Sequence, residues 1–268
     1  MEKLQIKFLK MILGVGQQTS NWATLTETGR FPLIVRVFGF MIKYLLHLMD
    51  SPSNIVKAAL STNIVLANKG INTWFKSISR ILKFCKLDHL LYTTDVKEIY
   101  SQIQMLKHNL NTIFIERWTK TRSEMMVNNN RLGILLDLKD TFEISSYLKL
   151  SKFPIHRIAM TKLRISAHRL PIETGRYEQI PREKRNCPFG CQQIGDEQHY
   201  IFQCGHPFML DLRKDFMSKI VKTEEETTPR VGDAVKMRNW FKSPLKSVVC
   251  LMGNYASNIL KMFKELTI

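Results

Sequence analysis

The sequence predicts a mainly α-helical protein, an irregular multi-helix array with one small Cys3His zinc-knuckle module. Apolar residues recur at spacings of three and four over much of the chain, which is the helical period. Hydrophobic residues make up 44% of the 268 residues, enough for a packed core and too many for a disordered or collagen-like chain. Three of the five cysteines lie close together beside a histidine, a pattern typical of a metal site in a reducing compartment.

The first predicted region, residues 1–150, is a series of helices joined by turns. Segment 71–85 carries the clearest pattern, because Trp74, Phe75, Ile78 and Leu82 share one stripe that is expected to face the core. Runs rich in glycine, proline, serine and asparagine separate the periodic segments. The predicted helices are 4–13, 32–49, 53–67, 71–85, 95–122 and 140–149.

The most apolar window, 31–49, is interpreted as a buried helix. It carries Arg36 and Lys43, and each charge would cost about 2.5–3.5 kcal/mol at the centre of a bilayer. Lys7 and Lys10 interrupt the N-terminal apolar stretch, so no signal peptide is expected. We therefore expect no membrane span and an intracellular location, in the nucleus or the cytoplasm.

The second predicted region, residues 151–222, begins with a helix over 153–170. Pro154 falls in its first turn and Pro171 just past its end. Arg157, Arg164 and His168 are expected to point outward, opposite the apolar side. A loop with Gly175 at its bend should follow, then the cysteines and a helix over 207–222. The third region, residues 223–268, is predicted to be an acidic linker followed by helices over 234–241 and 245–266.

The cysteine spacing predicts a closed structural Zn²⁺ site. Two cysteines lie four positions apart, and a histidine and a third cysteine follow one short element later, as in Cys3His zinc sites. Pro188 and Gly190 allow the sharp turn that brings the first two sulfurs together. Asp196 and Glu197 suit the first turn of a short helix that carries the histidine. The predicted ligands are Cys187, Cys191, His199 and Cys204.

Three alternatives to this ligand set stay open. The simplest is that the three cysteines are buried free thiols and that the histidine is unrelated to them. His206, two residues after Cys204, is a competing fourth ligand. An open zinc beside His206 or His168, with Glu197 as base, would instead make a metal hydrolase. Cys85 and Cys250 lie in apolar surroundings and are interpreted as core residues.

Catalytic motifs are absent from the sequence, so an enzyme is not expected. The chain has no adjacent pair of aspartates, no phosphate-binding glycine loop of either common type and no G-x-S-x-G or H-E-x-x-H sequence. Its aspartates are scattered, whereas a two-metal phosphoryl-transfer site needs clustered carboxylates.

The positive charge indicates a polyanionic partner and is concentrated just before the cysteines. Forty Lys and Arg against 23 Asp and Glu give a net charge of +17. Residues 1–150 carry 20 basic and 11 acidic groups, residues 151–190 carry 9 and 3, and residues 191–268 carry 11 and 9. The middle segment therefore has a net charge of +6 in only 40 residues.

Several runs resemble the C-terminal region of non-LTR (LINE-type) retrotransposon reverse transcriptases. The strongest are Leu163 to Cys187, containing HRLPIETGRYEQIPREKRNC, and Asp196 to Cys204, DEQHYIFQC; KMILGV and ETGRFPL upstream resemble the segment after the polymerase thumb. In that family an endonuclease and a polymerase with a Tyr/Phe-x-Asp-Asp box precede this region. Neither is present here, so the resemblance implies a non-catalytic fragment.

The resemblance implies that the zinc knuckle helps to bind template RNA or target DNA. Basic residues around the knuckle would contact phosphates, and Tyr177 or Phe189 would stack on an unpaired base unless they pack inside the protein. Apolar residues of 4–49 are expected to face the missing polymerase domain. The rival interpretation is a helical scaffold protein whose zinc site is purely structural. The predicted nucleic-acid contacts are Arg157, Arg164, Arg169, Arg176, Tyr177, Arg182, Lys184 and Arg185.

Overall fold

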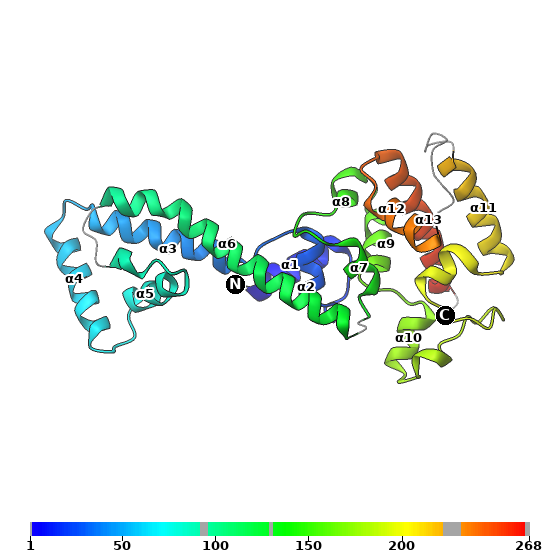
Figure 1. Cartoon of the computed structure of the whole chain (residues 1–268), viewed down its shortest axis with the longest axis horizontal. Coiled ribbons are helices and arrows are strands. Elements are labelled where there is room, and N and C mark those ends of the chain that lie inside the picture. Colours follow the sequence, from blue (N-terminus) through cyan, green and yellow to red (C-terminus); the bar gives the residue numbers. More distant parts are fainter. Residues whose placement is uncertain (1, 92–95, 129–130, 222–231, 266–268) are drawn as a thin grey trace. The chain divides into compact units, whose positions relative to one another are not determined.

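The structure is a computed structural model, and it describes residues 2–91, 96–128, 131–221 and 232–265. Figure 1 shows the helices in their chain order. They are α1 (Glu2–Leu13), α2 (Asn21–Thr28), α3 (Leu33–Met49), α4 (Asn54–Asn68), α5 (Trp74–Phe84), η1 (Asp88–Leu91), α6 (Val96–Val127), α7 (Gly133–Leu138), α8 (Ser146–Leu150), α9 (Pro154–Arg164), α10 (Pro171–Tyr177), η2 (Arg182–Lys184), η3 (His199–Gln203), α11 (Pro207–Val221), α12 (Asp233–Lys242) and α13 (Lys246–Glu265).

The mainly helical fold class is confirmed. Within the described ranges there is no strand, and one isolated antiparallel bridge joins Asn186 to Ile194. No single described helix is long and apolar enough to cross a membrane; α2 and α3 reach that length only when counted together as a bent pair. The predicted acidic linker lies almost wholly in 222–231, outside the described residues.

The chain divides into two compact units that differ from the predicted regions. Unit 1 comprises residues 1–5 and 31–121, and unit 2 comprises residues 6–30 and 122–268. The sequence-based boundary at residue 150 does not separate them, because residues 6–30 and 122–150 pack with the cysteine-bearing part of the chain.

Unit 1 has its core between α3, α4, α5 and the adjoining part of α6. The stripe of α5 faces inward as predicted, with Phe75, Ile78 and Leu82 all buried. The helix begins later than predicted, at Trp74, because the Thr73 hydroxyl caps it by accepting a hydrogen bond from the Lys76 amide at 3.2 Å.

Unit 2 has its core around the packed pair α9 and α13, with α11 and α12 alongside α13. Gly253 allows the two helices to approach closely. A Cβ atom at Gly253 would lie 2.6 Å from Cβ of His156, which is closer than two carbon atoms can pack. Aromatic rings join α11, α12 and α13 in this core. Phe216 of α11 stacks on Tyr255 of α13 with ring centroids 4.4 Å apart, and it meets Trp240 of α12 edge-on with centroids 5.1 Å apart.

Three short helices were missed by the sequence prediction, namely α2, α7 and α10. In α2 the threonine hydroxyls bond back to the helix, as Thr28 does to the Thr24 carbonyl oxygen at 2.9 Å. The buried face of this short helix is therefore largely polar, and it shows no clear apolar stripe. Gly29 ends α2 with a φ of 57°, and its missing Cβ leaves room for the backbone of Glu143 and Ile144. The predicted helix over 140–149 is reduced to α8.

The predicted helix over 153–170 stops at Arg164. Ser166 leaves the helical conformation with a φ of 51°. Two hydrogen bonds with Arg131 hold it there: the Ser166 hydroxyl donates to the Arg131 carbonyl oxygen at 2.8 Å, and the Arg131 guanidinium donates to the Ser166 carbonyl oxygen at 2.7 Å. The chain then restarts as α10 at Pro171, where a loop was expected.

Arg164 is buried, so the prediction that it points outward is wrong. Its Nε donates to Oε1 of the buried Glu27 at 2.6 Å, and its two other nitrogens donate to the Phe241 carbonyl oxygen and the Ser145 hydroxyl. The guanidinium also lies 5.1 Å from the ring centroid of Tyr147. A helical wheel counts every arginine as polar and cannot identify one that meets a buried carboxylate.

Candidate metal centre

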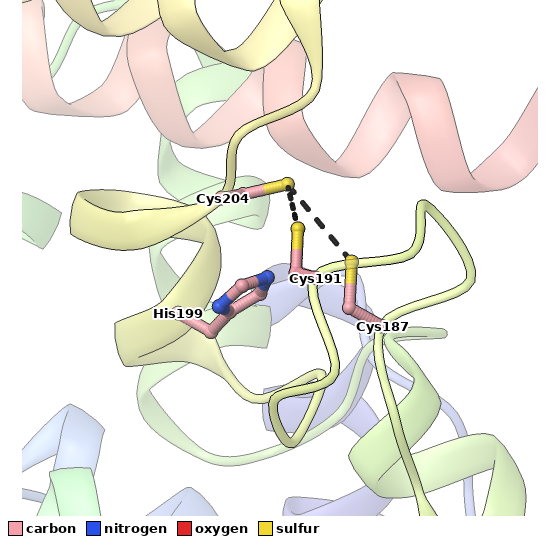
Figure 2. A group of neighbouring side chains, drawn as sticks. All are labelled: Cys187, Cys191, His199 and Cys204. Carbon is pink, nitrogen blue, oxygen red and sulfur yellow. Dashed lines mark hydrogen bonds between the residues drawn. The ribbon is translucent and has the colours of Figure 1, made fainter.

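The ligand atoms of Cys187, Cys191, His199 and Cys204 all lie within 4.8 Å of one another. Figure 2 shows the three sulfurs gathered together, with a ring nitrogen of His199 turned toward them. The Cys204 sulfur lies 3.9 Å from that of Cys191 and 4.0 Å from that of Cys187. Sulfurs bound at about 2.3 Å to a tetrahedral ion would be about 3.8 Å apart, so these spacings are compatible with one shared metal ion.

A tight turn brings the first two cysteines together, as the sequence predicts. Gly190 has a φ of 79° and Gln192 a φ of 53°, so the chain reverses through left-handed residues. After the reversal, the Cys187 amide donates to the Gln193 carbonyl oxygen at 2.8 Å. This hydrogen bond closes the turn that carries Cys187 and Cys191.

His199 is oriented by polar neighbours on both its backbone and its ring. The Asp196 carboxylate accepts a hydrogen bond from the His199 amide at 2.9 Å, so Asp196 caps the helical turn from just outside it, whereas the sequence placed Asp196 within the first turn. Nδ1 of the ring lies 2.9 Å from the side-chain oxygen of Gln193, so Nδ1 carries the proton and donates. Nε2 is buried without a hydrogen-bond partner, which leaves its lone pair for a metal ion.

The sulfurs differ in their electrostatic surroundings. A hydrogen bond from the Gly205 amide lowers the pKa of Cys191, with nearby Arg213 acting in the same direction. Burial raises the pKa of Cys204 to about 12, partly offset by a hydrogen bond from the His206 amide. Arg213 also donates to the Cys204 and Ile201 carbonyl oxygens at 3.0 and 3.1 Å, which ties α11 to the ligand-bearing segment.

The cluster belongs to the hydrophobic core of unit 2. Cys187 and Cys204 are buried there, and Tyr200 beside His199 packs its ring edge-on against Phe263 of α13, with centroids 4.6 Å apart. The ligands are thus fixed by long-range packing as well as by their own turn.

The alternative ligand His206 does not join the cluster. Its ring lies against Phe189, with centroids 4.3 Å apart, and Cys204 completes the set of four. Phe189 is half-buried and also contacts Phe263, so its ring packs against unit 2, the alternative that the sequence left open to stacking on a base. Cys85 is buried as predicted, and Cys250 is only partly buried.

His168 is buried, not exposed as predicted. Leu170 donates its amide to Nδ1 of His168 at 3.3 Å, and Nε2 lies 2.7 Å from Glu197, so Nε2 is the protonated nitrogen. Glu197 also accepts from the Ser166 hydroxyl at 3.3 Å. The carboxylate considered as a general base is therefore already bonded to His168 and Ser166.

The eight predicted nucleic-acid contacts fall into three groups. Arg164 is buried. Arg157 and Arg185 use their guanidinium groups on backbone carbonyls, Arg157 on Ser151 at 2.9 Å and Arg185 on Ile172 and Ile180 at 3.0 and 2.8 Å. The remaining five residues are exposed or partly exposed: Arg169, Arg176, Tyr177, Arg182 and Lys184.

The partly exposed Arg176 and exposed Tyr177 form a fixed pair at the end of α10. The guanidinium of Arg176 lies 4.3 Å from the ring centroid of Tyr177, whose side chain is 64% exposed. Nε of Arg176 donates to the buried carboxylate of Glu173 at 3.1 Å, and Arg131 binds the same oxygen at 3.2 Å. Two arginines thus hold Glu173, which in turn positions Arg176.

Two residues that matter to the metal centre were not identified from the sequence. Gln193 is an ordinary exposed amide whose role depends on the turn that places it beside His199. Arg213 lies nine positions beyond Cys204, and nothing in its local pattern distinguishes it from a surface arginine.

Comparisons with protein-family models, curated proteins and solved structures found no match to this chain.

Proposed function

We propose that this chain is a non-catalytic nucleic-acid-binding protein in which a structural Zn²⁺ ion stabilises the surface that contacts RNA or DNA. The observation that carries the proposal is the direct link between the metal cluster and the segment that carries the exposed Arg182 and Lys184. The Ile172 amide of α10 donates to the Gly195 carbonyl oxygen at 3.1 Å, and the Gly195 amide donates to the Arg185 carbonyl oxygen at 2.9 Å. The loop between the ligands is thereby joined to both ends of segment 171–185, which carries Arg176, Arg182, Lys184 and Arg185.

The donor set supports zinc as the metal. Three thiolates and one neutral imidazole are the ligands of structural Zn²⁺ sites, and four protein ligands leave no open position for a reacting water. Loaded with Zn²⁺, the centre would carry a charge of about −1, because three thiolates exceed the two charges of the ion. Arg213 and the Gly205 and His206 amides lie where they would stabilise that charge.

The exposed side chains support a nucleic-acid partner. Among the described residues, Arg169 and Lys184 form no ion pair, and Arg182 meets Asp196 only at 4.0 Å. Tyr177 offers an aromatic surface for an unpaired base. The resemblance to retrotransposon reverse transcriptases favours the same partner. We also propose that the exposed apolar residues Phe8, Met11 and Ile12 of α1 contact the polymerase domain that precedes this region in that family.

A second candidate is a helical scaffold in which the metal only stabilises the fold. Its supporting observation is the burial of the ligands in the core of unit 2, which is how a purely structural site would be built. Substituting Cys187 or Cys191 would not separate the candidates, because losing a ligand would disrupt the fold in both cases.

Surface variants provide the deciding experiment. We would measure the affinity of the zinc-loaded full chain for single-stranded RNA and DNA over a salt series. The test variant is Arg169→Ala, Arg182→Ala, Lys184→Ala. A matched control, Lys57→Ala, Lys69→Ala, Lys76→Ala, removes the same charge from unit 1. Each lost phosphate contact should reduce the salt slope by about 0.7 for a single strand.

Loss of affinity and of slope in the test variant alone would support the proposed surface. Equal losses in both variants would mean that binding is a diffuse effect of net charge. Absence of salt-sensitive binding by the unmodified protein would leave the structural scaffold as the correct interpretation.

A further inference from the structure

Tyr200 carries a buried hydroxyl beside the metal cluster. The residue follows the ligand His199 in η3, and its side chain is fully buried. Two neighbours hold its ring edge-on, with ring centroids 5.0 Å from His199 and 4.6 Å from Phe263. Among the described groups, the hydroxyl oxygen has no hydrogen-bond partner. Because a buried hydroxyl without a partner is costly, this one indicates an acceptor that becomes effective in another state of the site.

The loop between the ligands encloses this hydroxyl. A Cβ atom at Gly195 would lie 2.8 Å from the Tyr200 hydroxyl oxygen and 2.9 Å from side-chain carbons of Pro171. Atoms cannot pack that closely, so glycine at position 195 leaves the room that the hydroxyl occupies. The Gly195 carbonyl oxygen already accepts a hydrogen bond from the Ile172 amide at 3.1 Å. The hydroxyl is therefore held in place and finds its acceptor among its other neighbours.

The Cys187 sulfur is the neighbour that can serve as this acceptor. Burial raises the pKa of Tyr200 above its usual value, and a contact with the Cys187 side chain acts in the same direction, so the hydroxyl keeps its proton and can donate. A neutral thiol is a weak acceptor, whereas an ionised group accepts a stronger, charge-assisted hydrogen bond. A cysteine becomes a thiolate when it binds a metal ion. A hydrogen bond from Tyr200 to Cys187 therefore strengthens as the metal binds.

The other two sulfurs already have a donor each. The Gly205 amide donates to Cys191, and the His206 amide donates to Cys204. Three thiolates around one divalent ion leave a charge of about −1 in a buried site, and hydrogen bonds to the ligands stabilise that charge. A donor to Cys187 gives every sulfur of the cluster a hydrogen bond.

We propose that Tyr200 is a positioning residue of the metal centre, whose hydroxyl donates a hydrogen bond to the Cys187 thiolate when a metal ion is bound. The inference rests on the Zn²⁺ site of the proposed function and not on its nucleic-acid surface. Because the hydroxyl gains its acceptor in the loaded centre, Tyr200 favours the loaded form over the empty one. The ring contact with Phe263 joins the same residue to α13.

The test compares the unmodified full chain with Tyr200→Phe, which keeps the ring and removes the hydroxyl. We expect Tyr200→Phe to weaken Zn²⁺ binding by about 10–100-fold in competition with a chelator of known affinity. In the Co²⁺-loaded protein, the thiolate-to-metal charge-transfer band should shift to lower energy, because a sulfur that loses a hydrogen bond gives up its electrons more readily.

The matched control is Tyr147→Phe, which removes another buried hydroxyl of unit 2. That hydroxyl lies 2.8 Å from the Thr161 hydroxyl, and its loss should leave both the Zn²⁺ affinity and the Co²⁺ band unchanged. Unchanged affinity in Tyr200→Phe, or weaker binding with an unshifted band, would overturn the proposed hydrogen bond. An equal loss of affinity in Tyr147→Phe would overturn it as well, since the effect would then be one of core packing.

If Tyr200→Phe does not fold, Gly195→Ala decides, because its added methyl group would displace the Tyr200 hydroxyl while keeping the tyrosine. The Co²⁺ band should again shift to lower energy, and an unshifted band would overturn the proposal. Absence of metal binding by the unmodified chain would overturn both this inference and the Zn²⁺ site. Failure of the nucleic-acid assay alone would leave this inference standing.

Discussion

Arg164 shows how a single side chain can reverse its expected role. It forms a buried ion pair with Glu27 and contacts Ser145 and Phe241, within the core of unit 2. Removing one partner of such a pair leaves an uncompensated buried charge, which is more costly than replacing both.

We predict that Arg164→Met lowers the free energy of unfolding by about 3–5 kcal/mol. The double variant Glu27→Gln, Arg164→Met should recover much of that loss, since it removes both charges. Chemical denaturation measures all three proteins, with the exposed Arg169→Met as the control that should change little. A small effect of Arg164→Met would contradict the role of this ion pair in the core.

Gln193 should control the metal affinity without touching the metal. Its side-chain oxygen holds the proton on Nδ1 of His199, which aims Nε2 at the sulfurs. We predict that Gln193→Ala weakens metal binding by about 10–100-fold. Competition with a chelator of known affinity measures the change, and Gln198→Ala, an exposed glutamine on the same segment, should bind metal normally. Equal affinities for the two variants would contradict this role.

The raised pKa of Cys204 predicts that metal binding weakens in acid. Burial raises this pKa to about 12, so the thiol of the metal-free protein is protonated at neutral pH and must lose its proton when metal binds. Each proton released should make affinity fall about tenfold per unit decrease in pH. Chelator competition at two pH values, corrected for the chelator's own protonation, tests this; a pH-independent affinity would show that the thiolate forms before binding.

At the scale of elements, replacing two helical glycines by alanine should change stability in opposite directions. Gly253 lies where α13 contacts α9, and an added Cβ would overlap His156, so Gly253→Ala should destabilise unit 2 by about 1–3 kcal/mol. Gly39 in α3 has no atom within 4 Å of that position, so Gly39→Ala should stabilise its helix by about 0.5–1 kcal/mol. Thermal unfolding of both variants measures the signs; a stabilised Gly253→Ala would mean that the two helices can separate without cost.

The elements also show what the sequence could and could not predict. Long helices with a strong period were predicted within a few residues, as for α3, α4, α11 and α13. The short α2, α7 and α10 were missed, because caps and long-range contacts stabilise them more than any stripe does. The four residues of the Cys3His cluster were predicted to lie together, and they do, since their spacing lies within one local segment. Gln193 and Arg213 were not predicted, because their roles depend on the folded turn and on α11.

For the whole molecule, the position of the metal cluster predicts that the two units respond differently to a chelator. The ligands lie in the core of unit 2, and unit 1 has a separate core. Removing the metal should therefore lower the melting temperature of unit 2 and leave that of unit 1 nearly unchanged. Variants that retain only Trp240, in unit 2, or only Trp74, in unit 1, would report the two transitions separately. A shift of both transitions would show that the units unfold together.

The local spacing of the ligands also has a kinetic consequence. All four lie between Cys187 and Cys204, whereas the aromatic residue that packs beside them, Phe263, comes much later in the chain. Closing a short loop costs little chain entropy, so metal can bind before the distant helix is in place. We expect the loaded cluster to act as an early folding nucleus onto which α11, α12 and α13 then assemble. Refolding of unit 2 should accordingly be faster with Zn²⁺ present from the start than with Zn²⁺ added after collapse.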